Sequence, residues 1–142
     1  MKTLKHFING HYVAGSSEDS FELVSPVDGE TYAISPNANE AEVEQAYSAA
    51  EAAFSIWRKS TPAQRQKALL LLADEIERNV ERLVTAQSQE TGQLRHFIEK
   101  EEIAASCDAI RFFAGAARCL EGKAAGEYSA GFTSTIRRDT PD

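Results

Sequence analysis

The chain has 142 residues, which is enough for one ordinary domain. Hydrophobic residues make up 42% and charged residues 26%, a profile typical of globular proteins rather than disordered chains. The formal net charge of −7 argues against nucleic acid or an anionic membrane as the main partner, because both are bound through basic surfaces. No apolar run approaches the length of a membrane span, and the N-terminus lacks an apolar signal core, so we expect a cytoplasmic protein.

Residues 1–36 are predicted to be rich in β-structure. Asn9 and Gly10 lie between two short apolar runs, and this pair is a strong hairpin signal because both residues tolerate positive φ. A second strand is expected over residues 21–25 and a third over residues 31–35, with a proline- and glycine-containing turn between them.

From residue 37 onward the hydrophobic period becomes that of helices. Two capping-box pairs are expected to open the first two helices: Asn39 with Glu42, and Thr61 with Gln64. The first helix should extend to Trp57. The second begins with a proline at its first helical position, is interrupted near Asn79, and stops at Gly92.

A third helical stretch organises the rest of the chain. One long helix is predicted over Leu94–Leu120, followed by a turn at Gly122 and a strand over Phe132–Arg138. Cys107 and Cys119 both fall on the helical pattern, and we expect both to be packed, reduced thiols.

The predicted fold class is α/β, with N-terminal β-hairpins, three long helices and a C-terminal extended strand. Residues 1–36 form the β-rich part, residues 37–122 the helical part, and residues 123–142 a linker and an arm. Residues 123–131 are predicted to be a loop, which leaves the last strand without a partner of its own. A repeated strand–helix–strand pattern is missing. The chain therefore has the organisation of the front of a larger protein.

Several short motifs carry a family resemblance through their order and spacing. They are Phe7-Ile8-Asn9-Gly10, Val24-Ser25-Pro26-Val27-Asp28-Gly29-Glu30, the helix with Trp57, Thr61-Pro62-Ala63-Gln64-Arg65, Glu90-Thr91-Gly92 and Ile136-Arg137-Arg138-Asp139. Through these motifs the sequence resembles the N-terminal part of the aldehyde dehydrogenase superfamily. Within it, the runs 111–121, 125–128 and 133–139 resemble the γ-aminobutyraldehyde and betaine aldehyde dehydrogenases.

The resemblance implies an enzyme that oxidises an aldehyde to the carboxylic acid with NAD or NADP. In the family a cysteine thiolate attacks the aldehyde, hydride passes to the nicotinamide, and a glutamate activates water. These groups and the cofactor-binding residues are expected downstream of Asp142, so this chain should hold no catalytic or cofactor-binding residue and be inactive alone. Cys107 and Cys119 do not match the nucleophile's motif. Residues 1–122 would form the front part of the cofactor-binding domain.

A sodium or potassium ion is also implied by the resemblance, held largely by backbone carbonyls. The matching positions in this chain are Val24 and Glu90, and oxygen ligands suit such hard cations. The residues by themselves favour a plainer interpretation, in which Val24 belongs to the core of a strand and Glu90 is an acidic residue at a helix end.

Glu102 matches the position at which the aminoaldehyde enzymes meet the substrate's ammonium group, with Ala105 one turn further on. An ammonium group entering a partly apolar tunnel needs a carboxylate partner, because an unpaired charge is costly to desolvate. The alternative is that residues 99–102 form a solvated helix face, as charge runs usually do. Gln93 stands where the family commonly has lysine, and no lysine role is transferred to it.

The resemblance further implies that the arm over Phe132–Arg138 joins an oligomerisation sheet, so a homo-oligomer is expected. The isolated chain is expected either not to fold autonomously or to self-associate. Two functions are therefore open: the N-terminal part of an NAD(P)-dependent dehydrogenase of a small (amino)aldehyde, or a non-catalytic truncated or split fragment that acts only in self-association. A downstream segment with the catalytic cysteine and glutamate, in the same molecule or a partner, would distinguish them.

Overall fold

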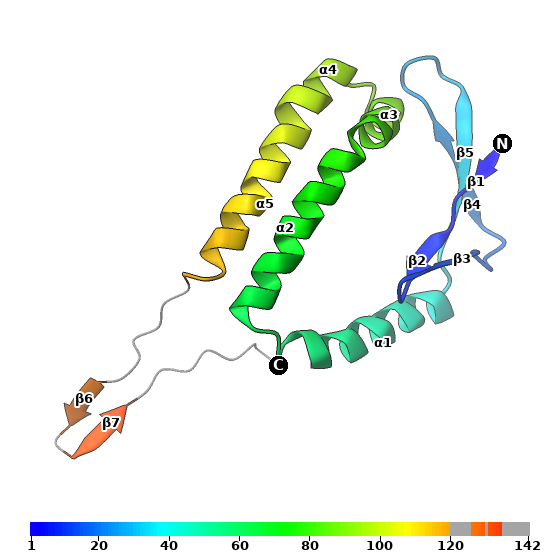
Figure 1. The fold of residues 1–142 in the computed structure, drawn as a ribbon. Helices are drawn as coiled ribbons and strands as arrows, with labels where there is room; N and C mark the ends of the chain where they lie inside the picture. Colours follow the sequence, from blue (N-terminus) through cyan, green and yellow to red (C-terminus); the bar gives the residue numbers. More distant parts are fainter. Residues whose placement is uncertain (120–125, 130, 135–142) are drawn as a thin grey trace.

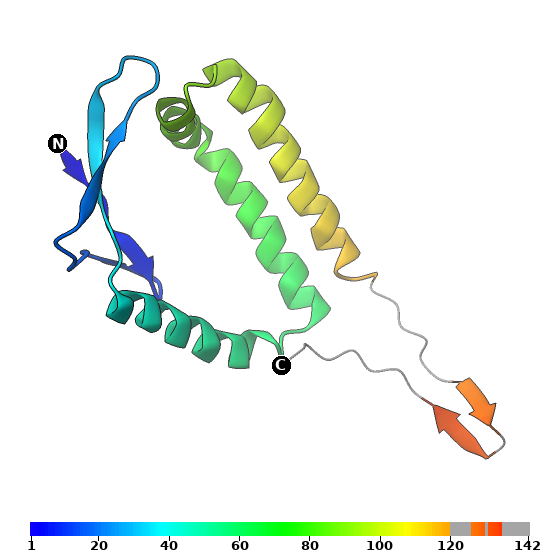
Figure 2. The same ribbon diagram turned by 180° about the vertical axis from the view of Figure 1, so that it is seen from behind.

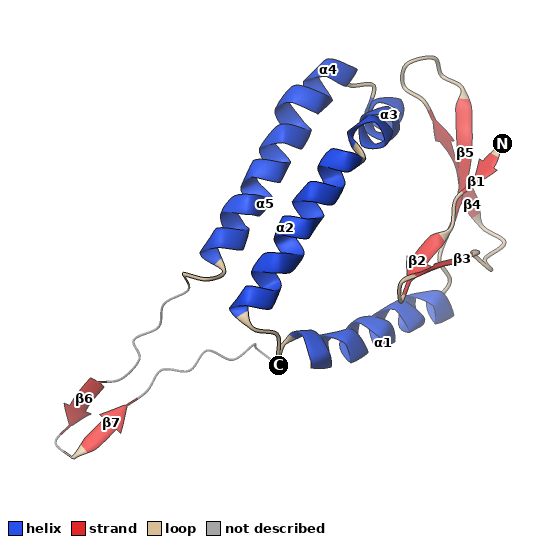
Figure 3. Ribbon diagram, viewed as in Figure 1, coloured by secondary structure: helices blue, strands red, loops and turns tan. Residues whose placement is uncertain are grey.

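The computed structural model describes residues 1–119, 126–129 and 131–134, and it shows an α/β arrangement of strands and helices (Figures 1 and 3). The strands are β1 (Lys2–Thr3), β2 (His6–Ile8), β3 (His11–Val13), β4 (Ser20–Val24), β5 (Thr31–Pro36), β6 (Gly126–Ser129) and β7 (Phe132–Ser134). The helices are α1 (Glu40–Trp57), α2 (Pro62–Arg78), α3 (Val80–Thr91), α4 (Arg95–Phe97), the π-helical η1 (Ile98–Ile103) and α5 (Ala104–Ala116).

The N-terminal β-rich region forms two small sheets. In the first sheet β5 is central, with β1 parallel on one side and β4 antiparallel on the other. The second is the β2–β3 hairpin, in which Asn9 and Gly10 have φ angles of 51° and 78°, as the predicted turn requires. Both predicted hairpins are confirmed. The parallel β1–β5 pair was not predicted, because a strand of two residues has no measurable period.

Local capping signals mark the starts of α1 and α2 and the end of α3. Both predicted capping boxes are present, so the first residues of α1 and α2 have side-chain partners for their free N–H groups. The interruption predicted near Asn79 is the boundary between α2 and α3. Gly92 follows α3 with a left-handed φ of 74°, which explains why a glycine stops this helix.

The long helix predicted over Leu94–Leu120 differs from the structure in two ways. Helical structure runs from Arg95 to Ala116 but passes through the π-helical turn η1, which a 3.6-residue period does not reveal. The helix also ends earlier than predicted, because Arg118 and Cys119 donate to the carbonyls of Gly115 and Ala116 and tighten the last turn. Leu120 and Gly122 lie outside the described residues.

The main core lies where α2, α3 and the η1–α5 helix meet, and α2 and α5 run side by side in both views (Figures 1 and 2). Ala73 of α2 and Ala114 of α5 have no exposed surface, and small side chains at these positions let the two helices approach closely. The buried cluster consists of Val84, Ile98, Ile103 and Cys107. This cluster is small for a chain of this length, so much apolar surface stays outside it.

Large apolar side chains lie exposed on several helices. Phe112 and Phe113 of α5 are 69% and 62% exposed. On α1 and α2 the more exposed members include Tyr47, Ile56, Trp57 and Leu71. These side chains leave apolar surface on α1, α2 and α5 that the described residues do not cover.

One prediction for the C-terminal arm, the loop over residues 123–131, is wrong in part. Residues 126–129, predicted as part of a loop, form β6 and pair antiparallel with β7. The predicted last strand therefore has a partner within the chain. The turn between them includes Gly131 with a φ of 82°, a conformation that glycine adopts without strain. Residues 135–138 of the predicted strand lie outside the described residues.

Glu42 connects the N-terminal β-region to α1. Its side chain is 8% exposed, and its carboxylate accepts hydrogen bonds from the N–H groups of Asn39 and Ser16 at 3.0 and 2.8 Å. The Asn39 bond, followed by the Ser16 bond, holds the pKa of Glu42 below its ordinary value. The imidazole Nε2 of His6 lies 3.7 Å from the same carboxylate.

Replacing Glu42 with glutamine should destabilise the chain in a pH-dependent way. A carboxyl group whose pKa is lowered by folding stabilises the fold above its unfolded-state pKa, and this contribution is lost as the pH falls through the folded-state value. Urea denaturation should therefore show a clear loss for Glu42→Gln at about pH 7 and a much smaller one at about pH 3. Glu51→Gln, an exposed position on the same helix, is the control; equal losses at both pH values for Glu42→Gln would contradict this prediction.

No helix among the described residues is long and apolar enough to cross a membrane.

Candidate functional site

Glu102 is part of a hydrogen-bonded polar cluster at the π-helical turn. The amide Nε2 of Gln93 donates to one carboxylate oxygen of Glu102 at 2.8 Å, and the amide of Gln87 donates to the other oxygen. The two glutamines are also joined, because Gln87 Nε2 lies 2.9 Å from Gln93 Oε1. The cluster is partly buried between α3 and η1, so the carboxylate position is determined by two elements and not by one helix alone.

Gln93 is held in place by the end of α3. The hydroxyl of Ser88 donates to the backbone carbonyl of Gln93 at 2.8 Å, and the hydroxyl of Thr91 donates to its side-chain oxygen at 3.2 Å. Sequence reasoning missed this role and treated Gln93 only as a departure from a family pattern. No periodicity links residues 87, 93 and 102, so the cluster could be found only from the tertiary structure.

The other residues of the charge run behave as a solvated face. Glu99, Lys100 and Glu101 are exposed, and Lys100 pairs with its neighbour Glu99 at 3.1 Å. Glu102 differs, being half-buried and bonded to two amides. Ala105 is exposed in the first turn of α5. Glu102 lies in the π-helical turn η1, and such turns occur often at functional sites.

The segments that carry Val24 and Glu90 lie next to each other. A Cβ built on Gly92 would lie 3.2 Å from Cγ of Pro26, which places the end of α3 against the turn after β4. A pocket of about 270 Å³ nearby is lined by residues that include Leu23, Tyr32 and Glu90. Val24 itself is 52% exposed, so it is not the strand core residue that the plainer interpretation assumed.

The ion implied at Val24 and Glu90 stays a prediction. Its ligands would be backbone carbonyls of two chain segments that lie next to each other. A side-chain metal site has no support: among residues 1–119, 126–129 and 131–134, no three histidine, cysteine, aspartate or glutamate side chains are arranged to hold a metal ion.

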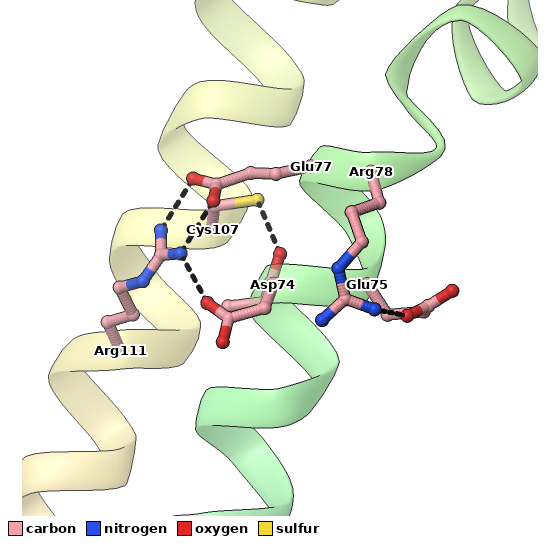
Figure 4. A network of polar contacts seen from close by, with 7 residues as sticks. Asp74, Glu75, Glu77, Arg78, Cys107 and Arg111 are labelled. Atoms are coloured by element: carbon pink, nitrogen blue, oxygen red, sulfur yellow. Dashed lines mark hydrogen bonds and ion pairs between the residues drawn. The ribbon is translucent and has the colours of Figure 1, made fainter.

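Arg111 joins α5 to α2 through a fork of ion pairs (Figure 4). Its guanidinium donates to both carboxylate oxygens of Glu77 at 2.7 Å and to Asp74 at 2.9 Å. The hydrogen bond to Glu77 is the largest cause of the raised pKa of Arg111, and the same bond lowers the pKa of Glu77. Because all three side chains are more than a third exposed, this fork contributes little to the stability of the helix pair.

The two cysteines have different environments. Cys107 is 2% exposed, and its thiol lies 3.8 Å from the carbonyl oxygen of Ala73. Burial raises the pKa of the Cys107 thiol, and the nearby Glu77 adds to the effect, so the reactive thiolate is disfavoured. Cys119, predicted to be packed, is exposed, because it follows the early end of α5. Cys107 therefore has the environment of a structural residue.

Comparison with known proteins places this architecture in a family. The sequence pattern of the aldehyde dehydrogenase family matches residues 12–141, which is most of the chain. The chain belongs to the aldehyde dehydrogenase family.

Relatives and solved structures agree with this assignment. A long-chain-aldehyde dehydrogenase of Acinetobacter sp is 35% identical over 118 residues, which cover 83% of this chain and 24% of the relative. A crystal structure of an NAD-dependent benzaldehyde dehydrogenase from Corynebacterium glutamicum matches with a TM-score of 0.80 and 27% identity, over 89% of this chain and 28% of that one. PnpE, solved in complex with nicotinamide adenine dinucleotide, matches with a TM-score of 0.83 and 31% identity, over 94% and 27%.

The chain thus spans about a quarter of the length of the proteins that it matches. The match extends to the fold, which is the predicted α/β fragment of an aldehyde dehydrogenase. The similar proteins named here carry long-chain-aldehyde and benzaldehyde in their descriptions, so the predicted closeness to aminoaldehyde enzymes is not shown by them.

Proposed function

We propose that this chain is the N-terminal part of an NAD(P)-dependent dehydrogenase that oxidises an aldehyde to the carboxylic acid. The observation that supports the proposal most directly is the family match over residues 12–141, together with relatives whose descriptions name NAD. The activity belongs to a dehydrogenase that contains these residues together with the remaining portion of the family's chain.

The described residues do not form a Rossmann-type nicotinamide site by themselves. The Rossmann type of dinucleotide site has a glycine-rich turn between a parallel strand and the N-terminus of a helix. Within the described residues the parallel pair is β1–β5, and β5 leads into α1 through Asn37-Ala38-Asn39, which contains no glycine. As the family resemblance implies, we propose that the rest of the family's chain binds the cofactor and carries out the chemical steps. The role left for this chain is to support the site and to contact the substrate.

We further propose that Glu102 selects a substrate with a cationic amino group. A carboxylate has about four lone-pair sites, and the two glutamine amides occupy two of them. The remaining sites can accept hydrogen bonds from an ammonium group. Gln87 and Gln93 would keep the carboxylate in position before the substrate arrives, which lowers the entropy lost on binding.

Replacing Glu102 with glutamine tests this substrate proposal. The assay uses the chain joined to the remaining portion of the Acinetobacter relative, and follows NADH formation with 4-aminobutanal and with uncharged pentanal. Loss of the charge should raise KM for the aminoaldehyde about tenfold or more and leave KM for pentanal within about twofold. The exposed neighbour substitution Glu101→Gln is the matched control.

Three results of this assay would decide between the open functions. Equal changes for both aldehydes in the Glu102→Gln variant would give Glu102 a structural role only. An active joined protein that prefers pentanal would support the dehydrogenase activity and contradict the proposed aminoaldehyde substrate. A joined protein that folds but reduces no NAD with any aldehyde would favour the non-catalytic fragment that acts through association.

We also propose that the arm contributes to a homo-oligomer. In the two-stranded β6–β7 sheet each strand has one edge that is not paired within that sheet. Such edges pair readily with a strand of another subunit, and this supports the expectation that the arm joins an intersubunit sheet.

A further inference from the structure

The turn of the β2–β3 hairpin places an unbonded amide beside an unhindered main-chain nitrogen. Asn9 and Gly10 are both exposed, and they form this turn with φ angles of 51° and 78°. Among the described residues, neither the side chain of Asn9 nor the N–H group of Gly10 has a hydrogen-bond partner. A Cβ built on Gly10 would meet nothing within 4 Å, so the space on that side of the turn is open.

The hairpin that carries this turn can open locally. β2 and β3 have three residues each, and together they form a two-stranded sheet that pairs with no other strand of the described residues. Phe7 and Tyr12, which contact each other across the hairpin, are 66% and 70% exposed, and only Ile8 is buried among the six strand residues. A two-stranded hairpin by itself has marginal stability, so the turn can leave its folded geometry while the helices stay folded.

We propose that Asn9 is a site of spontaneous deamidation. The main-chain nitrogen of Gly10 attacks the side-chain carbon Cγ of Asn9, a C–N bond forms, and the amide nitrogen of Asn9 leaves as ammonia with the proton from Gly10. Water then adds to one of the two carbonyl groups of the succinimide ring, which opens to aspartate or to isoaspartate at position 9. No electrons are transferred and the only co-reactant is water, so the proposal does not rest on the dehydrogenase activity.

The structure distinguishes Asn9 from the other residues that could form such a ring. At the other asparagines the next residue carries a side chain, which hinders the main-chain nitrogen, and Asn39 also has its side-chain oxygen and nitrogen in hydrogen bonds of 2.9 and 2.7 Å. Asp28 precedes a glycine, but its carboxylate accepts the N–H of Glu30 at 3.0 Å, and this bond lowers the pKa of Asp28. Because an ionised carboxylate resists nucleophilic attack, ring closure at Asp28 is disfavoured.

Deamidation would change both the charge and the geometry of the hairpin. Either product replaces a neutral amide with a carboxylate, so the formal net charge goes from −7 to one unit more negative. The new charge would lie at a groove of about 320 Å³ that the turn forms with alanines of α1. Isoaspartate also adds a carbon to the main chain, and the two-residue turn that pairs Ile8 with His11 would lose its geometry.

The test incubates the joined protein at mildly alkaline pH and follows residue 9 over time by peptide mass spectrometry. Deamidation changes the mass of the peptide that contains residue 9, and electron-transfer fragmentation distinguishes isoaspartate from aspartate. Conversion at Asn9 should be at least about tenfold faster than at the other asparagines of residues 1–142 or at Asp28, a difference of about 1.4 kcal/mol in activation free energy. The matched control is Asn9→Gln, which keeps an amide but needs a larger ring, and this variant should stay unchanged at residue 9.

A urea-unfolded sample, incubated in parallel, gives the rate in the absence of the fold. Selective conversion at residue 9 of the folded joined protein supports the proposal. Three results overturn it: an Asn9 that stays intact in the folded protein while the unfolded sample converts, equal conversion at other asparagines, or isoaspartate that accumulates at Asp28 at the same rate. A folded joined protein that deamidates at Asn9 but reduces no NAD would count against the proposed function alone.

Discussion

Replacing Ile98 with alanine is expected to lower the free energy of unfolding by about 2–5 kcal/mol. Ile98 has no exposed surface, and its neighbours in the buried cluster include Val84, Ile103 and Cys107. Alanine removes three carbon atoms and leaves a cavity that these helices cannot close without losing their own contacts. Since small domains have a total stability of only about 5–15 kcal/mol, the loss is a large share of what holds the helices together.

Urea denaturation followed by the far-ultraviolet helix signal measures this loss. The matched control is Ile56→Ala, because Ile56 is the same residue type in a helix but is 76% exposed. The control should change the free energy of unfolding by no more than about 0.5 kcal/mol. Similar losses for the two variants would mean that the cluster around Ile98 is not the principal core of this chain.

Replacing Gly92 with alanine is expected to destabilise the chain by about 1–2 kcal/mol, and by more if Pro26 cannot move. The φ of Gly92 is 74°, a left-handed conformation in which an L side chain meets its own backbone. The new Cβ would also lie 3.2 Å from Cγ of Pro26, closer than ordinary contact. The substitution therefore strains both the end of α3 and its junction with the turn after β4.

Two further glycines separate these causes. Gly29 has a φ of 76° with nothing near its absent Cβ, so Gly29→Ala should show the conformational cost alone. Gly115 lies in α5 with open space around it, and Gly115→Ala should stabilise the helix by about 0.5–1 kcal/mol. A loss for Gly92→Ala no greater than that for Gly29→Ala would show that the contact with Pro26 carries no strain.

The strands and helices of residues 1–92 were largely predictable because their signals are local. The Asn9-Gly10 turn and the two capping boxes each involve residues no more than three positions apart. A short stretch of sequence is therefore enough to predict each of these interactions. The π-helical turn and the early end of α5 were not predictable in the same way. The first is a change of hydrogen-bonding pattern within a continuous helix, and the second comes from backbone bonds of Arg118 and Cys119 to Gly115 and Ala116, so apolar periodicity indicates neither.

The candidate site was likewise only partly predictable from the sequence. The family resemblance indicated Glu102, but its two amide partners are residues 9 and 15 positions away. Likewise, the sequence treated Cys107 and Cys119 alike, whereas packing against α2 buries the first and the end of the helix exposes the second. Such differences arise from contacts between elements, so no local pattern could separate them.

The sequence by itself determined the family, the α/β class, the hairpins and the capped helices. These features depend on the order of short motifs and on hydrogen bonds between residues that are close in sequence. Only the tertiary structure decided which carboxylate is held by Gln87 and Gln93, which thiol is buried, and which apolar faces stay uncovered. The physical reason is that burial and side-chain pairing are properties of helices and strands brought together from distant parts of the chain.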